Sequence, residues 1–208
     1  MILNMYITLM SVILAGILNM FFTKTKIYNL YKYPIDGGKK FFDGQDIFGK
    51  NKTWIGFFSM IVFNIISQII VGFFCKNIDF LNGRNYVYIR LDNNLINNIM
   101  VGFFLGLAYV VFELPNSFIK RRLNILPGKT DRGIKGIIFF IVDQIDSIVG
   151  VTLVLSIWYK MSTLQFFLFI LLGAVTHIVI NLILYIIKIR KNIWGEKLWF
   201  LLESIINL

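Results

Sequence analysis

Cysteine is nearly absent from this chain, and its scarcity excludes two kinds of chemistry. Cys75 is the only cysteine among 208 residues. An intrachain disulfide requires two cysteines, and a Cys-x-x-Cys metal motif requires a pair at fixed spacing, so the sequence has neither. Cys75 lies at the end of an apolar segment, where a packing role accounts for it. Any site must therefore be built from other side chains.

An internal repeat and a signal peptide are also missing. Many secondary transporters are built from repeats that show as symmetry in the sequence, and none is visible here. The first apolar segment has no basic residues ahead of it and no Ala-x-Ala-like cleavage site, whereas Lys24 and Lys26 follow it. We therefore expect this segment to anchor the protein in a membrane.

Apolar residues, in contrast, are abundant. They make up 57% of the chain, and the mean hydropathy is +0.73. Five segments approach or reach the roughly 20 residues that cross the hydrocarbon of a bilayer, namely residues 2–22, 55–74, 95–114, 137–158 and 164–187. The sequence therefore predicts an all-α polytopic membrane protein with about five transmembrane helices, forming a single domain over residues 1–208.

Positive charge is concentrated in two loops and the tail. Of 21 Lys and Arg residues, seven lie in residues 23–53, six in 115–135 and four after Ile187, and the net charge is +10. The positive-inside rule places these segments in the cytoplasm and the N-terminus outside. Because the basic residues adjoin apolar segments, attraction to the membrane surface explains them better than nucleic acid, and we expect no nucleic-acid partner. The apolar tail, residues 193–208, is short and is predicted to lie at the interface.

Two carboxylates stand inside the fourth apolar segment. Asp143 and Asp146 are three residues apart, so they share one face of a helix. Ionised groups at that depth are costly and persist only beside a partner, a metal or water. No Lys or Arg lies on the inner part of this segment, so the counter-charge must come from another segment, a bound cation, or both. Carboxylates with water and phosphate oxygens form a Mg²⁺ site without cysteine or histidine.

The first basic loop contains two turn signals. Asp36-Gly37-Gly38 and Asp43-Gly44 place glycine, which accepts positive φ without steric cost, after aspartate. We expect the loop to fold back on itself instead of forming a long helix. Exposed glycine amides beside lysines can cradle a phosphate, so this loop is a candidate phosphate site. A loop that only sets topology is the alternative.

The third apolar segment runs into a proline and a basic cluster. Pro115 has no amide hydrogen, which predicts that the helix ends or kinks at Leu114. Asn116 or Ser117 could then cap a short second helix. In that arrangement the basic residues 120–122 would lie near a helix start, where the dipole is already positive. An anionic ligand would relieve this conflict, although a positive-inside cluster is the simpler explanation.

Polar residues recur on one face of two further apolar segments. Asn64, Ser67 and Gln68 are spaced to form a stripe for hydrogen bonds between helices. His177 and Asn181 are four apart in the last segment. A lone histidine in a membrane helix is usually a hydrogen-bonded packing residue, and ligand binding or proton transfer is the alternative.

Taken together, these units resemble the CDP-archaeol synthase family, which is related to the CDP-diacylglycerol synthases. They occur in the order found in that family and cover most of the chain, and the family's five-helix architecture agrees with the five apolar segments. The matching units are residues 34–38, Phe41 with Asp43-Gly44, residues 49–56, residues 116–122 with Pro127-Gly128, residues 143–146, and Thr176-His177 with Asn181, Tyr185, Lys188 and Trp194.

The resemblance implies a reaction and a set of site residues. CTP and a phosphatidic-acid-like lipid would give a CDP-lipid and pyrophosphate for phospholipid synthesis, with Mg²⁺ held by Asp143 and Asp146. Lys120 and Arg121 would join these aspartates as catalytic residues by contacting phosphates. CTP, a membrane lipid phosphate and the bilayer would be the partners, a homodimer is a further expectation, and the site would face the cytoplasm at the cell membrane. The implied substrate-binding residues are Asp36, Gly37, Gly38, Asp43, Gly44, Lys52, Thr53, Asn116, Ser117, Arg122, Gly128, His177 and Asn181.

The lipid substrate is left open, because two features compared with the related bacterial signature point in opposite directions. That signature contains Asp-Arg-x-Asp-Ser, and Gln144 stands here where its arginine would be. The departure favours the archaeal-type family, which acts on an isoprenoid diether phosphate. Asp146-Ser147 nevertheless matches the bacterial form, whose substrate is a diacyl phosphate.

Two other functions compete with this interpretation. A CDP-alcohol phosphotransferase needs Asp-Gly-x-x-Ala-Arg, and no Ala-Arg follows Asp43-Gly44. A membrane cation or lipid transporter could use Asp143 and Asp146 as an ion site. It would leave the Asp-Gly loop and the basic cluster without a role.

Overall fold

The computed structural model describes residues 1–129, 131 and 133–188, and this part of the chain is helical. The helices are α1 (Ile2–Phe22), α2 (Lys26–Leu30), α3 (Trp54–Asn77), the short 3₁₀ helix η1 (Tyr86–Ile89), α4 (Leu95–Arg122), α5 (Gly133–Trp158) and α6 (Thr163–Ile186). Five of them, α1, α3, α4, α5 and α6, are long and apolar enough to cross a membrane. The predicted all-α fold with five spans is confirmed, while the predicted interfacial tail, residues 193–208, lies outside the described residues.

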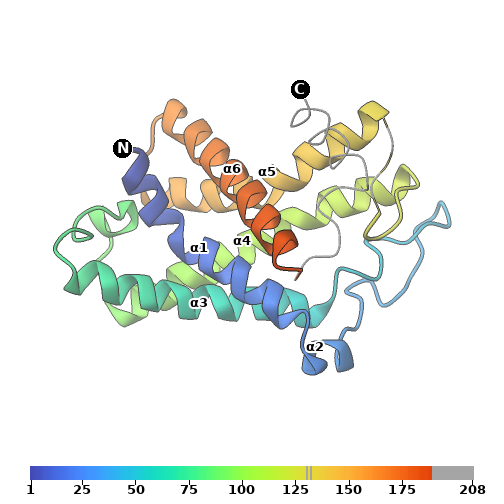
Figure 1. The fold of residues 1–208 in the computed structure, drawn as a ribbon, viewed down its shortest axis with the longest axis horizontal. Coiled ribbons are helices and arrows are strands. Elements are labelled where there is room, and N and C mark those ends of the chain that lie inside the picture. The colour runs from blue at the N-terminus through green and yellow to red at the C-terminus, as the bar shows by residue number, and fades with distance from the viewer. Residues whose placement is uncertain (130, 132, 189–208) are drawn as a thin grey trace.

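The helix α4 holds the bundle together, since it packs against both α3 and α5, while α1 lies on α3 and α6 on α5 (Figure 1). Small residues allow these close approaches. A Cβ atom at Gly102 would lie 2.6 Å from the Cα of Ile65, and one at Gly106 would lie 2.8 Å from the Cα of Ile61. This Gly-x-x-x-Gly spacing is a common way for membrane helices to pack closely.

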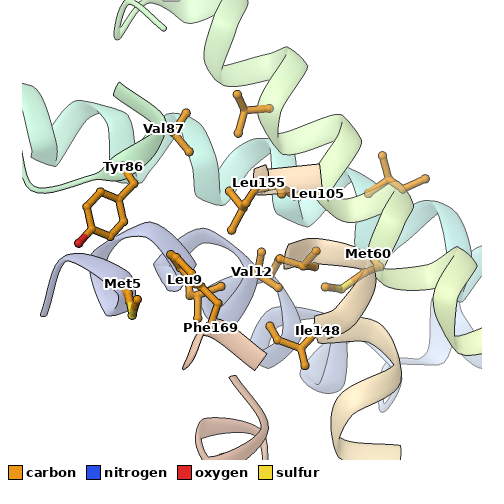
Figure 2. Close-up of a cluster of buried hydrophobic side chains, with 14 of the residues drawn as sticks. Met5, Leu9, Val12, Met60, Tyr86, Val87, Leu105, Ile148, Leu155 and Phe169 are labelled. Atoms are coloured by element: carbon orange, nitrogen blue, oxygen red, sulfur yellow. The ribbon is translucent and has the colours of Figure 1, made fainter. Parts of the chain in front are cut away.

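The apolar core is formed where the N-terminal part of α1 meets the other spans. Figure 2 shows side chains from α1, α3, η1, α4, α5 and α6 converging there. The labelled residues are Met5, Leu9, Val12, Met60, Tyr86, Val87, Leu105, Ile148, Leu155 and Phe169. This core fixes the helices at one end of the bundle, and the polar residues of the candidate site gather at the other.

The polar stripe predicted on α3 is buried between helices. Asn64, Ser67 and Gln68 have no exposed surface. The Nε2 of Gln68 donates to the hydroxyl of Tyr88 at 2.9 Å, and that hydroxyl donates to Oδ1 of Asn98 at 2.6 Å. Hydrogen bonds therefore connect Gln68 of the stripe to α4 through Tyr88 of η1.

Of the two predicted effects of Pro115, a helix end or a kink at Leu114, the helix end is wrong. The helix α4 continues through Pro115 to Arg122, because a proline removes only one backbone hydrogen bond and membrane helices tolerate that loss when neighbours pack around it. The basic residues 120–122 therefore lie in the last turn of α4, where the helix dipole favours cations. The proposed second helix, capped by Asn116 or Ser117, and its electrostatic conflict do not exist.

The loop between α2 and α3 folds back on itself, as predicted. Isolated antiparallel bridges pair Pro34 with Thr53 and Lys40 with Asp46. The glycines of the Asp-Gly units have the positive φ that such turns require: 60° at Gly37, 74° at Gly38 and 77° at Gly44. The loop lies against the ends of α4 and α3 (Figure 1).

Candidate active site

A cavity of about 400 Å³ lies at the end of the bundle where α1, α4 and α6 end and α3 begins. All five spans and the loop before α3 contribute to its wall. Ten residues expected at the site line this cavity: Lys52, Thr53, Asn116, Ser117, Lys120, Arg121, Gly128, Asp143, Asp146 and His177. Segments far apart in sequence therefore bring most of the expected site together.

The two α5 carboxylates are bound by α4. The Nδ2 of Asn116 donates to Oδ1 of Asp143 and to Oδ2 of Asp146, both at 2.7 Å. Lys120, one turn further along α4, forms an ion pair with Asp143. A counter-charge for Asp143 thus comes from another segment, which was one of the predicted alternatives.

A third carboxylate, Glu113, reaches the same cavity and was missed by the sequence analysis. It forms an ion pair with Lys52 from the loop. Burial is the largest single effect and lowers the pKa of Lys52. The charge and hydrogen bond of Glu113 and the charges of the two α5 aspartates together outweigh burial, so the pKa is raised. Glu113, Asn116 and Lys120 are spaced by three and four residues, so they share a face of a continuous helix. The expected break at Pro115 hid this pattern.

Asp36 folds the loop. Its Oδ2 accepts hydrogen bonds from the amides of Phe48 and Gly49 at 2.9 and 2.8 Å, and its Oδ1 accepts one from Gly38 at 3.0 Å. Burial tends to raise the pKa of Asp36, but these amide hydrogens outweigh it, and the pKa is lowered. The Asp36 carboxylate is therefore engaged within its own loop. Gly37, Gly38 and Gly44 form turns in the same loop.

The three basic residues at the end of α4 have three different surroundings. Lys120 faces the carboxylates. Arg121 is buried and donates from Nε to the carbonyl of Phe48 at 3.1 Å and from its guanidinium to the carbonyl of Ile125, which ties the loop to the chain after α4.

Arg122 fastens the other side of the loop. Its guanidinium forms an ion pair with Asp43 and lies over the rings of Phe41 and Phe118, 5.0 and 4.4 Å from their centroids. Cation–π contacts of this kind add to the ion pair. Asp43 and Arg122, both expected to bind substrate, are therefore paired with each other.

His177 and Asn181 separate along α6. His177 lines the main cavity and also a smaller cavity of about 80 Å³ between α1, α5 and α6. Asn181 lines only the smaller one, where its Nδ2 donates to Oε1 of Gln144 at 3.2 Å. Asn181 is thus not beside the carboxylates.

The residues around Asp143 and Asp146 fit Mg²⁺. Both supply hard oxygen atoms. The Oδ1 of Asn116, a residue that lines the cavity, is buried and has no hydrogen-bond partner among the described residues. No group of three or more His, Cys, Asp and Glu residues within residues 1–129, 131 and 133–188 is arranged to hold a metal. Mg²⁺ suits a two-carboxylate site because it keeps several waters and binds substrate phosphates.

Comparison with known proteins identifies the family. The sequence model of the CarS-like CDP-archaeol synthases matches residues 3–194. The chain belongs to the CDP-archaeol synthase family. As a member of this family, it is a multi-pass membrane enzyme, a CTP-dependent cytidylyltransferase that acts on a lipid phosphate. The predicted family resemblance and enzyme class are thereby confirmed.

Individual CDP-archaeol synthases resemble the chain over most of its length. That of Pyrobaculum aerophilum is 27% identical over 164 residues, which are 79% of this chain and 84% of the relative. That of Methanocaldococcus jannaschii is 28% identical over 166 residues, 77% and 82% of the two chains. A solved structure of an intramembrane enzyme for archaeal membrane lipid biosynthesis matches with a TM-score of 0.60 at 19% identity, over 89% of this chain and 95% of that one. At this identity the structural match shows the fold.

Proposed function

We propose that this protein transfers CMP from CTP to an isoprenoid diether phosphate, giving a CDP-lipid and pyrophosphate, with Mg²⁺ as cofactor and with the site on the cytoplasmic side of the cell membrane. The observation that carries the proposal is the cavity where Asn116 of α4 binds both Asp143 and Asp146 and Lys120 pairs with Asp143. The naming of the relatives as CDP-archaeol synthases supports the diether lipid over a diacyl lipid.

In the proposed reaction an oxygen of the lipid phosphate attacks the α-phosphorus of CTP. The bond from that phosphorus to the bridging oxygen breaks, and pyrophosphate leaves with the electron pair. A phosphate monoester has a second pKa of about 6. The attacking oxygen is therefore already anionic at neutral pH and needs no base from the protein.

The chain's own residues hold and neutralise charge in this scheme. Asp143 and Asp146, fixed by Asn116, would hold the metal, which when bound neutralises triphosphate charge. Lys120 and Lys52 lie on the same cavity and would stabilise the negative charge that develops on the phosphates. A membrane transporter would leave these paired lysines without a role, and membership of a synthase family gives that alternative no support.

The test is a CTP-incorporation assay in detergent–lipid micelles with Mg²⁺. The isoprenoid diether phosphate and diacyl phosphatidic acid are supplied in parallel, and Asp146→Asn is the control. We expect CDP-lipid from the diether substrate and a loss of at least about 100-fold in the variant, with an unchanged thermal unfolding profile. A well-folded protein that is inactive on both lipids would contradict the proposal, and preference for the diacyl lipid would contradict its substrate.

A further inference from the structure

A short segment beside the cavity exposes an unusual amount of apolar surface. Residues 24–33, which contain α2, lie at the edge of the bundle beyond the adjoining ends of α1 and α3 (Figure 1). α2 itself buries none of its residues. The exposed fraction is 61% for Ile27 and 71% for Leu30 in α2, and 55% for Tyr31 and 70% for Tyr33 just after it. We therefore expect another molecule to cover the apolar surface of residues 24–33.

The charge of the segment indicates which occupant. Lys24, Lys26 and Lys32 are exposed among these apolar and aromatic side chains, and residues 24–33 contain no Asp or Glu. Aromatic rings favour the headgroup level of a bilayer. Lysines beside them are attracted to anionic lipids, and a helix with both features lies in the interface plane. An anionic lipid surface therefore fits residues 24–33 better than a neutral one.

One residue of the segment points the other way, into the cavity. Tyr28 lines the cavity, and its hydroxyl is 2.9 Å from Oγ1 of Thr53. Its ring packs edge-on against Phe22, with the centroids 5.9 Å apart. A Cβ atom at Gly56 would lie 3.4 Å from the Tyr28 hydroxyl, so the tyrosine rests on the start of α3. Tyr28 thus links the outward surface to the cavity wall.

We propose that residues 24–33 bind an anionic lipid surface and that this binding holds Tyr28 against Thr53, so that turnover depends on the charge of the surrounding headgroups. The binding itself is independent of the reaction. The dependence of turnover rests on the proposed cytidylyltransferase function. Tyr28 acts in this scheme as a positioning residue, through Thr53.

The first test measures binding without activity. Tyr31→Cys in a Cys75→Ala background carries an environment-sensitive dye, and the protein is placed in nanodiscs of phosphatidylcholine alone or mixed with phosphatidylglycerol. We expect a blue shift of the dye in the anionic nanodiscs, and we expect its loss in the triple variant Lys24→Gln, Lys26→Gln, Lys32→Gln, since each lysine near the surface contributes roughly fivefold in membrane affinity.

A matched triple variant at the opposite end of the bundle, Lys76→Gln, Arg90→Gln, Lys160→Gln, removes the same charge and should keep the shift. The same dye emission in neutral and anionic nanodiscs would overturn the binding. Equal loss of the shift in both triple variants would also overturn it, because a general charge effect would then explain the result.

The second test measures CTP incorporation in the same two kinds of nanodisc. Turnover should rise in the anionic nanodiscs, and Tyr28→Phe should abolish that rise while it keeps the dye shift. A dye shift with turnover indifferent to headgroup charge would overturn the coupling. A dye shift in a protein inactive on every lipid would instead overturn the proposed function and leave the binding intact.

Discussion

Asn116 is the side chain that both α5 carboxylates share. Its Nδ2 donates to Asp143 and to Asp146, so it holds two like charges near each other. Groups that orient metal-binding carboxylates often matter nearly as much as the carboxylates themselves. We therefore expect the loss of Asn116 to affect activity nearly as much as the loss of a carboxylate.

Asn116→Ala should lower CTP incorporation by roughly 10- to 100-fold and weaken the response to Mg²⁺, because the two carboxylates are then free to separate. The measurement is a Mg²⁺ titration of initial rates. Asn98→Ala is a matched control, since Asn98 is also a buried asparagine of α4 but lies near the start of the helix and does not line the cavity. Equal effects of the two substitutions on the Mg²⁺ response would contradict this role.

Glu113 and Lys52 should act as one unit. Glu113→Gln would free the Lys52 amine to approach the α5 aspartates, and Lys52→Gln would leave the carboxylate of Glu113 uncompensated. Each single variant should lose activity by roughly 10-fold or more. Because paired residues are not additive, the double variant should be no worse than the poorer single one. Losses that multiply in a double-mutant cycle of kcat/KM would show that the ion pair has no functional coupling.

At the scale of an element, the loop between α2 and α3 depends on Asp36. Because the pKa of this carboxyl is lowered, its contribution to stability is present above the ordinary value of 3.8 and is lost as the pH falls through the lower, folded-state pKa. The wild-type loop should therefore become protease-sensitive in acid. At neutral pH, Asp36→Asn should destabilise the protein by about 2 kcal/mol, because hydrogen bonds to a charged acceptor are lost.

Limited proteolysis and thermal unfolding in micelles measure both effects. Asp79→Asn, an aspartate at the opposite end of the bundle, serves as the control. Unchanged cleavage within residues 37–48 of the Asp36→Asn protein would show that the loop is held by other contacts, such as those of Arg121 and Arg122.

The crossing of α4 and α5 depends on the absence of a side chain at Gly150. A Cβ atom there would lie 2.5 Å from Cγ of Phe112 and 2.8 Å from the carbonyl oxygen of Ala108. Gly150→Ala should therefore cost about 1–3 kcal/mol through overpacking, seen as a lower unfolding temperature in micelles. Gly16→Ala adds the same methyl group to α1, where nothing lies within 4 Å, and should not destabilise. A Gly150→Ala protein as stable as wild type would mean that the helices separate at little cost.

The elements were largely predictable because membrane spans are set by hydrophobicity. The predicted limits 2–22 coincide with those of α1, and the other spans differ by a few residues at their ends. The exception is α4, whose last two turns are polar and follow Pro115. Local rules for proline and helix dipoles assume an isolated helix, and they failed here because α5 and the loop pack around this part of α4.

At the scale of the whole molecule, the site was only partly predictable. Residue type and spacing placed Asp143 and Asp146 on one helix face, and the family resemblance added Lys120 together with Arg121 and Arg122. The pairing of Lys52 with Glu113 joins residues 61 positions apart, and the contact between Arg121 and the carbonyl of Phe48 joins residues 73 apart. Such contacts follow from how the loop folds onto α4, which no periodic pattern in the sequence encodes.

Five spans place the start of α1 and the end of α6 on opposite sides of a membrane, and the basic loops predict which side is which. Cysteines at Asn82, between α3 and η1, and at Lys39, in the basic loop, would report the orientation in a Cys75→Ala background. We expect a membrane-impermeant maleimide to label Asn82→Cys on intact cells and Lys39→Cys only after permeabilisation. The reverse pattern would invert the topology.

The buried stripe of Asn64, Ser67 and Gln68 has a consequence for how the protein is made. When α3 leaves the ribosome, neither Tyr88, which accepts the hydrogen bond of Gln68, nor Asn98, which accepts that of Tyr88, has been synthesised. Polar amides facing lipid are costly, so α3 cannot settle as an isolated span. Its insertion into the membrane must be completed together with α4, and the α3–α4 hairpin becomes the first unit of assembly.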